Sequence, residues 1–334
     1  MKKIKTIFST LVLLQIVAFE TSNAAEQTKE DPVLSSEPKH VAITQIVEHP
    51  ALDASRKGIK DELADQGYII GKNLKWTYEN AQGAAPTAAQ IAKKFAGINP
   101  DIVVGIATPS AQTLAASARN IPLVFSAVTD PVGAKLVKSM EDNTGSNVTG
   151  VSDLSPIDKH MKLIKQIVPT STRLGVVHNP GETNSVTLVN LVKLYAPEHG
   201  MSVVIGSAPK SSDVLAATRS LVGKVDAIYI PTDNTVVSAF EAVIKVAQQA
   251  KIPVIAADTD SVKRGAIAAL GFNYYDLGRQ TGNIIAAILN GVSPSDIPVQ
   301  GVSKTELYVN PKAAELMGVS LPEELIREAK EIIQ

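Results

Sequence analysis

The chain has 334 residues, 45% of them hydrophobic, with 32 Lys and Arg against 33 Asp and Glu, and its formal net charge is −1. Binding to nucleic acid rests on clustered basic charge, which this near-neutral chain lacks, so we expect no nucleic-acid partner. The chain has no cysteine, which excludes disulfides, thiol catalysis and a lipid-modified cysteine.

The N-terminus has the pattern of a secretory signal peptide. Residues 1–5 are basic, residues 6–19 are mostly apolar but too few to span a bilayer comfortably, and Ser22-Asn23-Ala24 offers small residues for cleavage. We predict a cleaved signal peptide at 1–24 and an exported protein that is not lipid-anchored; a retained membrane anchor is the alternative. Loss of three lysines and one glutamate with this segment takes the net charge from −1 to −3. Residues 25–38 lack periodicity, which predicts a disordered leader.

After the leader, short β-branched runs alternate with amphipathic helical patterns, as is typical of parallel sheets covered by helices. The first series predicts strands at 40–46, 73–78, 101–106 and 121–127 and helices at 51–66, 87–96 and 109–118. The second series predicts helices at 156–168, 184–196, 211–222 and 235–250 and strands at 173–178, 202–206, 226–230 and 252–256. The fold class predicted is α/β, with two Rossmann-like lobes that each contain a parallel sheet.

The two series also resemble each other in sequence. Residues 101–130 and 226–260 both begin with an Asp-led strand, continue through a polar tip and a helix, and reach Ile-Pro and a strand that ends in Thr-Asp. Two similar lobes explain this likeness, and chance similarity between two α/β halves is the alternative.

Three short stretches, at 146–152, 265–271 and 304–309, interrupt the helical rhythm and are predicted to be hinge crossovers. They divide the chain into lobe 1 (39–150 plus 272–303, with a helix at 276–290) and lobe 2 (151–264 plus 310–334, with a helix at 321–332). A three-crossover hinge permits closure of the two lobes around a ligand.

Ligands of such sheets bind beyond the carboxyl ends of the strands. The tips expected there are 45–53, 107–112, 126–130, 178–185, 231–235 and 257–260. We expect Thr108 to be the N-cap of its helix and Pro109 the first helical residue. The amides of Ser110 and Ala111 would then be free to bind a carboxylate, and simple capping is the alternative reading.

The tips of the second lobe are acidic, with Glu182, Asp233, Asp258 and Asp260. Free amides opposite carboxylates match the two charges of an α-amino acid. Each acid has capping as an alternative role. We favour Asp258 as the partner of the ligand ammonium, because it follows a strand directly.

No cofactor or metal is expected. His49 and His178 occupy equivalent first-loop positions but have no second ligand at helical spacing, so we interpret them as polar loop residues. The aromatic residues Trp76, Tyr274 and Tyr275 are assigned to packing. The candidate ligand-binding residues are Glu48, His49, Thr108, Ser110, Ala111, Gln112, Ser126, Thr129, Asn179, Glu182, Asn184, Ser185, Asp233, Asn234 and Asp258.

Several stretches resemble the tryptophan/tyrosine-type family of ABC-transporter substrate-binding proteins, across nearly all of 39–320. Among them are "EHPALD", "IATPSAQ", "FSAVTDPVGAKLV", "NPGETNS", "PTDNTVVSA" and "DSVKRGAIAALGFNYYDLGRQTG". The resemblance implies a type I periplasmic-binding fold that closes on an amino acid, with aromatic ligands expected, and delivers it to an ABC permease in the inner membrane. We expect a monomer.

Two other classes of function remain as alternatives. One is a ligand-sensing accessory protein for a membrane receptor. The other is an enzyme that processes amino acids, but the chain has no Gly-x-Ser-x-Gly or His-Glu-x-x-His motif, so no catalytic residue is assigned and the protein is predicted not to be an enzyme.

Overall fold

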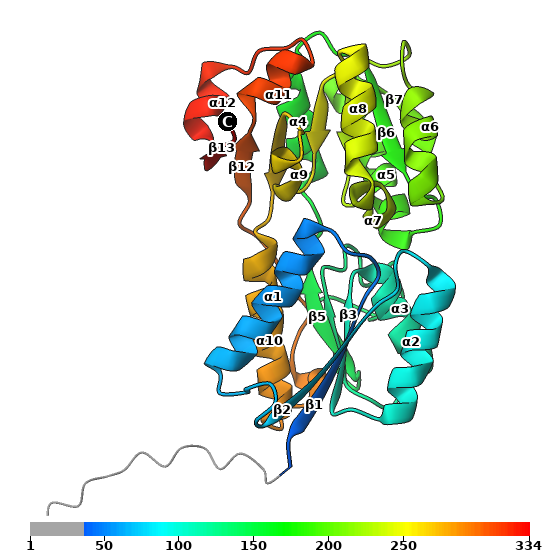
Figure 1. The fold of residues 1–334 in the computed structure, drawn as a ribbon, viewed down its shortest axis with the longest axis vertical. Coiled ribbons are helices and arrows are strands. Elements are labelled where there is room, and N and C mark those ends of the chain that lie inside the picture. The colour runs from blue at the N-terminus through cyan, green and yellow to red at the C-terminus, as the bar shows by residue number, and fades with distance from the viewer. Residues whose placement is uncertain (1–36) are drawn as a thin grey trace, which may run out of the picture. The chain divides into compact units, whose positions relative to one another are not determined.

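The computed structural model of the protein describes residues 37–334, which form one compact unit. The predicted signal peptide and the leader as far as residue 36 lie outside the described residues. The unit contains two β-sheets covered by helices (Figure 1), which confirms the α/β fold. No helix within 37–334 is long and apolar enough to cross a membrane.

The first sheet has six strands, all parallel, in the order β11-β5-β4-β3-β1-β2. Parallel strands covered on both faces are apolar throughout, and every residue of β3 is buried. The strands are β1 (Lys39–Gln45), β2 (Leu74–Asn80), β3 (Ile102–Ile106), β4 (Leu123–Ser126), β5 (Val148–Ser152) and β11 (Gln300–Gly301). The helices that accompany them are α1 (Pro50–Asp65), α2 (Ala85–Ile98), α3 (Thr108–Ser117) and α10 (Tyr274–Leu289).

The second sheet has seven strands in the order β13-β12-β10-β9-β8-β6-β7, all parallel except for the antiparallel pair β10–β12. The strands are β6 (Arg173–His178), β7 (Ser202–Ser207), β8 (Ala227–Ile230), β9 (Val254–Ala256), β10 (Ala268–Gly271), β12 (Glu306–Val309) and β13 (Glu331–Ile332). Its helices are α4 (Ile157–Ile167), α5 (Thr183–Tyr195), α6 (Val214–Arg219), α7 (Asn234–Ser238), α8 (Phe240–Ala250), α9 (Asp260–Lys263), α11 (Pro311–Leu316) and α12 (Glu323–Glu328). Short 3-10 turns lie at Ala196–His199, Ser211–Asp213 and Pro294–Asp296.

Three helices predicted for lobe 2 differ from the structure. The helix expected at 235–250 is divided into α7 and α8 at Ala239, whose φ of −117° is not helical. The helix expected at 211–222 is a 3-10 turn followed by the six residues of α6. The helix expected at 321–332 ends at Glu328, because the following residues extend the sheet as β13. There the Lys330 amide donates to the carbonyl of Leu307, and the Ile333 amide donates to that of Val309.

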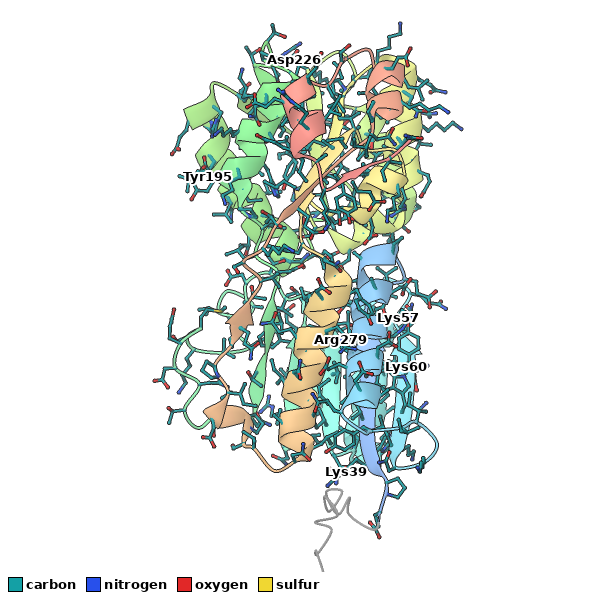
Figure 2. All side chains as sticks on the ribbon, turned by 90° about the vertical axis from the view of Figure 1, so that its left-hand side faces the viewer. Lys39, Lys57, Lys60, Tyr195, Asp226 and Arg279 are labelled. Atoms are coloured by element: carbon teal, nitrogen blue, oxygen red, sulfur yellow. The ribbon has the colours of Figure 1, made fainter. Side chains whose placement is uncertain are left out.

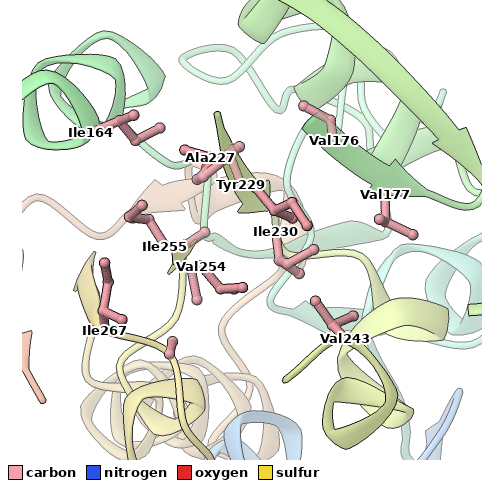
Figure 3. Packing of buried hydrophobic residues seen from close by; sticks show 14 of the residues in the cluster. Ile164, Val176, Val177, Ala227, Tyr229, Ile230, Val243, Val254, Ile255 and Ile267 are labelled. Atoms are coloured by element: carbon pink, nitrogen blue, oxygen red, sulfur yellow. The ribbon is translucent and has the colours of Figure 1, made fainter. Parts of the chain in front are cut away.

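The second sheet is built around a continuous apolar core (Figure 3). Ile228, Tyr229 and Ile230 of β8 are fully buried. The hydroxyl of Tyr229 lies 2.7 Å from Nδ1 of His160, and Nε2 of His160 lies 2.7 Å from the carbonyl of Leu270. The two polar groups of this core are therefore hydrogen-bonded, as buried polar groups require.

The chain passes between the two sheets three times, from β5 to α4, from β10 to α10 and from β11 to β12. The second passage places α10 against α1, and Figure 2 shows Arg279 on α10 beside Lys57 and Lys60 on α1. The two helices approach closely because glycines face the contact. A Cβ on Gly58 would lie 2.1 Å from the Tyr275 carbonyl oxygen, and one on Gly278 would lie 2.0 Å from that of Ser55.

Candidate functional site

A small cavity lies between the carboxyl ends of strands from the two sheets. The first sheet contributes the start of α1, the segment after β4, the residue after β5 and the first residue of α10; the second sheet contributes the start of α5 and the segments after β8 and β9. The lining residues are His49, Ala51, Leu52, Ala127, Thr129, Asp153, Asn184, Thr232, Asn234, Val237, Asp258 and Tyr274. Strand ends of parallel sheets are the usual position of a ligand site.

Two of the lining residues are buried aspartates. Asp153 accepts hydrogen bonds from the hydroxyls of Thr129 (3.2 Å) and Tyr274 (2.7 Å). Asp258 accepts from the amide (2.9 Å) and the hydroxyl (2.7 Å) of Ser261. All of these donors are neutral, and the cavity lining contains no Lys or Arg. Burial raises the pKa of both carboxyls above the ordinary value. A cation bound in the cavity would stabilise the ionised form of each.

Asp233 has a different environment, although it is also fully buried. Its Oδ1 accepts from the Val236 amide (2.9 Å) and so caps α7. Its Oδ2 accepts from the Asn179 amide and from the Ser185 hydroxyl (2.6 Å). Burial, with repulsion from Glu182, raises the pKa of Asp233 to about 7. Asp233 does not line the cavity and joins two loops of the second sheet.

Glu182 is also held by the protein itself. Its Oε1 accepts from the amide (3.0 Å) and hydroxyl (2.7 Å) of Thr235, and its Oε2 accepts from the amide (3.2 Å) and Nδ2 (2.6 Å) of Asn234. The side chain of Asn184 adds a donor at 3.2 Å. Glu182 therefore fixes the loop after β8 against the start of α5.

The helix after β3 begins one residue earlier than predicted. Ala107 is the N-cap, not Thr108, because the Ala107 carbonyl accepts from the amide of Ala111 (3.1 Å) while its amide donates to the Ser126 carbonyl (2.9 Å). The Ala111 amide is thus not free, contrary to prediction. The hydroxyls of Thr108 and Ser110 are buried and have no hydrogen-bond partner within the described residues.

Backbone strain accompanies two strand ends of the first sheet. Ala107, after β3, has φ 71° and ψ 158°, and Ala127, after β4, has φ 56°. The φ and ψ of Ala107 form a combination that almost only glycine adopts. Backbone strain of this kind costs about 1–3 kcal/mol per residue and is concentrated at functional sites. Ala127 itself lines the cavity.

His49 and Asn234 face each other across the cavity from the two sheets. His49 is the N-cap of α1, and its side chain hydrogen-bonds with that of Asn234. Burial and the positive charge of Arg264 lower the pKa of His49, and the hydrogen bond with Asn234 offsets part of this decrease. The resulting pKa is about 3, so the imidazole is neutral. Within the described residues, Nδ1 of His49, Oδ1 of Asn184 and Oγ1 of Thr232 are buried without partners. Unpaired polar atoms in one cavity indicate a polar ligand.

The structure separates the residues predicted from sequence into three groups. His49, Thr129, Asn184, Asn234 and Asp258 line the cavity. Glu48 lines a neighbouring hollow, and Asn179, Glu182 and Asn234 line a wider groove that also includes Pro109. Seven others line none of these spaces: Thr108, Ser110, Ala111, Gln112, Ser126, Ser185 and Asp233.

Besides Asp233 and Ser185, two more of this third group have structural contacts of their own. The Ser126 hydroxyl lies between those of Ser55 (2.9 Å) and Thr281 (2.8 Å) and so links β4 to α1 and α10. Nε2 of Gln112 donates to the Ala134 carbonyl (3.2 Å) and to the Thr183 hydroxyl (3.3 Å).

Sequence reasoning missed Asp153 and Thr232 and assigned Tyr274 to packing. Asp153 directly follows β5, so its place at a strand end was a usable signal. Thr232 lies in the same tip as Asn234. Tyr274 begins α10, two residues before the start predicted for that helix, and no local pattern places its side chain in the cavity. In the described part of the chain, no group of three or more His, Asp or Glu could hold a metal ion.

Residues 40–333 match the family model of the ABC transporter substrate binding proteins. The "Tyrosine-binding protein" of Clostridioides difficile (strain R20291) is 42% identical over 289 residues, which cover 86% of this chain and 83% of that protein. The fold is that of type I periplasmic binding proteins.

Two solved structures are similar over 89% of the chain. An ABC domain from Streptococcus pneumoniae in complex with L-Trp is 36% identical, with a TM-score of 0.86 and all of its chain covered. A ligand-free, open structure of a substrate binding protein with adhesive properties from Clostridium difficile is 41% identical, with a TM-score of 0.66 and 99% of its chain covered.

Proposed function

Because the chain belongs to the ABC transporter substrate-binding protein family, we propose that its cavity binds a free aromatic amino acid and presents it to an ABC permease. The observation that carries this proposal is the pair of buried aspartates, Asp153 and Asp258, in a cavity without a basic residue. The α-ammonium of the ligand supplies the missing cation. A buried carboxylate without a cation is costly, so the ammonium contributes to both recognition and stability.

Asp258 is the principal partner of the ammonium in this proposal. It lies just after β9, and its two oxygens accept from the amide and the hydroxyl of Ser261. Asp153 is oriented by Thr129 and Tyr274 on the first-sheet side of the cavity. An ammonium has three N–H donors, so it can satisfy both carboxylates at once.

The start of α3, predicted to bind the ligand carboxylate, does not line this cavity, and the hydroxyl of Thr129 already donates to Asp153. We therefore do not place the ligand carboxylate at the start of α3.

The aromatic character of the ligand is supported from two sides. Ala51 and Leu52 of α1, Ala127, and Val237 of α7 give the cavity apolar walls suited to a ring. The relatives named above bind tyrosine in one case and L-Trp in the other.

The two lobes close on the ligand by rotation about the three connecting segments. The TM-score is higher with the L-Trp complex than with the ligand-free open protein, although identity is lower. This ranking supports a closed arrangement of the described residues. Small-angle scattering that finds the same radius of gyration with and without saturating ligand would contradict closure.

The predicted signal peptide supports export to the periplasm, where such a protein would act as a monomer. Mass spectrometry of the small molecule retained after native purification, followed by calorimetry on stripped protein, tests the proposed function. We expect recovery and tight binding of tyrosine or tryptophan. Recovery of a sugar or nucleoside, with no binding of aromatic amino acids, would refute the proposal.

A further inference from the structure

The side chain of Gln112 connects the two lobes. Gln112 lies in α3, which accompanies the first sheet, and Thr183 is the first residue of α5, which accompanies the second sheet. Nε2 of Gln112 lies 3.3 Å from Oγ1 of Thr183 and 3.2 Å from the carbonyl oxygen of Ala134. The two helices are also in direct contact. The sequence predicts ligand binding for Gln112, but Gln112 does not line the cavity, so its contacts point to a different role.

The direction of these hydrogen bonds follows from the groups involved. A carbonyl oxygen can only accept, so the group of Gln112 that faces Ala134 is the amide nitrogen. That nitrogen carries two hydrogens, and each has one acceptor, the Ala134 carbonyl in the first lobe and the Thr183 hydroxyl in the second. Gln112 thus donates a hydrogen bond from one lobe to the other.

This bridge of Gln112, Ala134 and Thr183 lies beside the cavity without being part of it. Ala134 belongs to the segment after β4 that also contains the lining residue Thr129, and the lining residue Asn184 directly follows Thr183. None of the three bridging residues lines the cavity. Gln112 can therefore act on a bound ligand only through the relative position of the two lobes.

The bridge also lies away from the segments that connect the lobes. In the first sheet β3, which precedes α3, is two strands from β5, and in the second sheet β6, which precedes α5, is three strands from β10. In Figure 1 α3 and α5 lie on the right, whereas α10, which follows the passage from β10, lies on the left. Adjacent strands are about 4.8 Å apart, so the bridge is about 10–14 Å from these connections. At that distance an opening rotation of about ten degrees moves the bonded atoms about 2 Å further apart, beyond hydrogen-bond range.

We propose that Gln112 holds the lobes in the closed arrangement and thereby slows release of the bound amino acid. The hydrogen bond to Thr183 forms as the lobes close and must break before they open. It is absent from the open protein that the ligand enters, so it should affect the rate of dissociation much more than that of association. Gln112 is then a positioning residue for binding. This inference rests on the proposed function, since it assumes closure of the lobes around an aromatic amino acid.

Stopped-flow kinetics with L-Tyr and L-Trp on stripped protein test the inference. Gln112→Met keeps the length of the side chain but has no donor, and Thr183→Val keeps the shape but has no acceptor. Each should raise the dissociation rate by about two- to tenfold, and the double variant should release the ligand no faster than Gln112→Met. Thr183→Ser, which retains the hydroxyl, should release it at the native rate. Thr113→Val is the matched control: the Thr113 hydroxyl donates to the Ser110 carbonyl (2.9 Å) within α3, and its loss should leave the dissociation rate unchanged.

Native dissociation rates in both Gln112→Met and Thr183→Val, with tight ligand binding, would overturn the role of Gln112 and leave the proposed function intact. Failure of the native protein to bind either amino acid would overturn both. Effects that add fully in the double variant would also refute the bridge, because the two side chains would then act independently. If Gln112→Met does not fold, the Thr183 variants decide the matter: faster release by Thr183→Val than by Thr183→Ser supports the bridge, and equal release refutes it.

Discussion

The hydroxyl of Tyr274 donates a 2.7 Å hydrogen bond to Asp153 and so joins the first residue of α10 to the residue after β5. Both residues lie at points where the chain passes from one sheet to the other. Both also line the cavity. The candidate site and the connecting segments thus share residues, so in the proposed closure a bound ligand would act directly on the segments about which the lobes rotate.

Tyr274→Phe should lower the free energy of unfolding by about 1–3 kcal/mol, because a buried carboxyl loses its shortest hydrogen bond. Tyr275→Phe is the matched control. The hydroxyl of Tyr275 donates to Asp61, a half-buried pair, and its loss should cost less than about 1 kcal/mol. Chemical denaturation measures both. Equal costs would show that Asp153 does not depend on Tyr274.

Asp258→Asn should weaken binding of the aromatic amino acid by about two to three decades, since the buried ammonium loses its carboxylate. The ligand-free variant should melt no lower than the native protein, because it no longer buries a carboxylate without a cation.

Asp233→Asn serves as the comparison, because Asp233 caps α7 and does not line the cavity. It should lower stability by about 0.5–2 kcal/mol and affect affinity less. Normal binding by Asp258→Asn together with lost binding by Asp233→Asn would show that the ammonium partner is misassigned.

Affinity should decrease towards acid pH. Burial raises the pKa of Asp258 in the free protein, whereas a bound ammonium favours its ionised form. Binding is therefore at full strength above the free-state pKa and is lost as the pH falls through it, earlier than for an ordinary aspartate. His49, with a pKa of about 3, stays neutral in this range. Calorimetry as the pH is lowered from about 8 should show the decline in the native protein, and a smaller one in Asp258→Asn, in which Asp153 remains to be protonated. An affinity that rises towards acid would contradict this account.

Ala107→Gly should raise the free energy of unfolding by up to about 2 kcal/mol, because glycine adopts φ 71° and ψ 158° without strain. Ala116→Gly, at an exposed position in the same helix, should lower it by about 0.5–1 kcal/mol. Thermal or chemical denaturation compares the two. A loss of stability in both variants would indicate that Ala107 is not strained.

The sequence predicted those strands and helices that show a regular pattern of apolar residues. Apolar runs and helical patterns located most strands and helices, and the strand-end rule located five of the candidate residues that line the cavity. It did not predict β5, β10 and β12, which lie within the predicted crossovers at 146–152, 265–271 and 304–309. It also did not predict β11, or β13, which lies within the helix predicted at 321–332. Nor did the sequence distinguish the acidic residues whose carboxylates bind protein donors from the one that lines the cavity. Asp233 and Glu182 are occupied by donors from other loops, whereas Asp258 is oriented by its own segment, and no local pattern reveals that difference.

Recognition of the ligand ammonium by the two cavity aspartates can be tested by calorimetry with L-tryptophan and indole-3-propionate on stripped protein. The two ligands share the ring and the carboxylate, but indole-3-propionate has no ammonium. We expect tight binding of L-tryptophan and a loss of about two decades or more for indole-3-propionate, since Asp153 and Asp258 would then face a ligand without a cation. Equal affinity for the two compounds would contradict it.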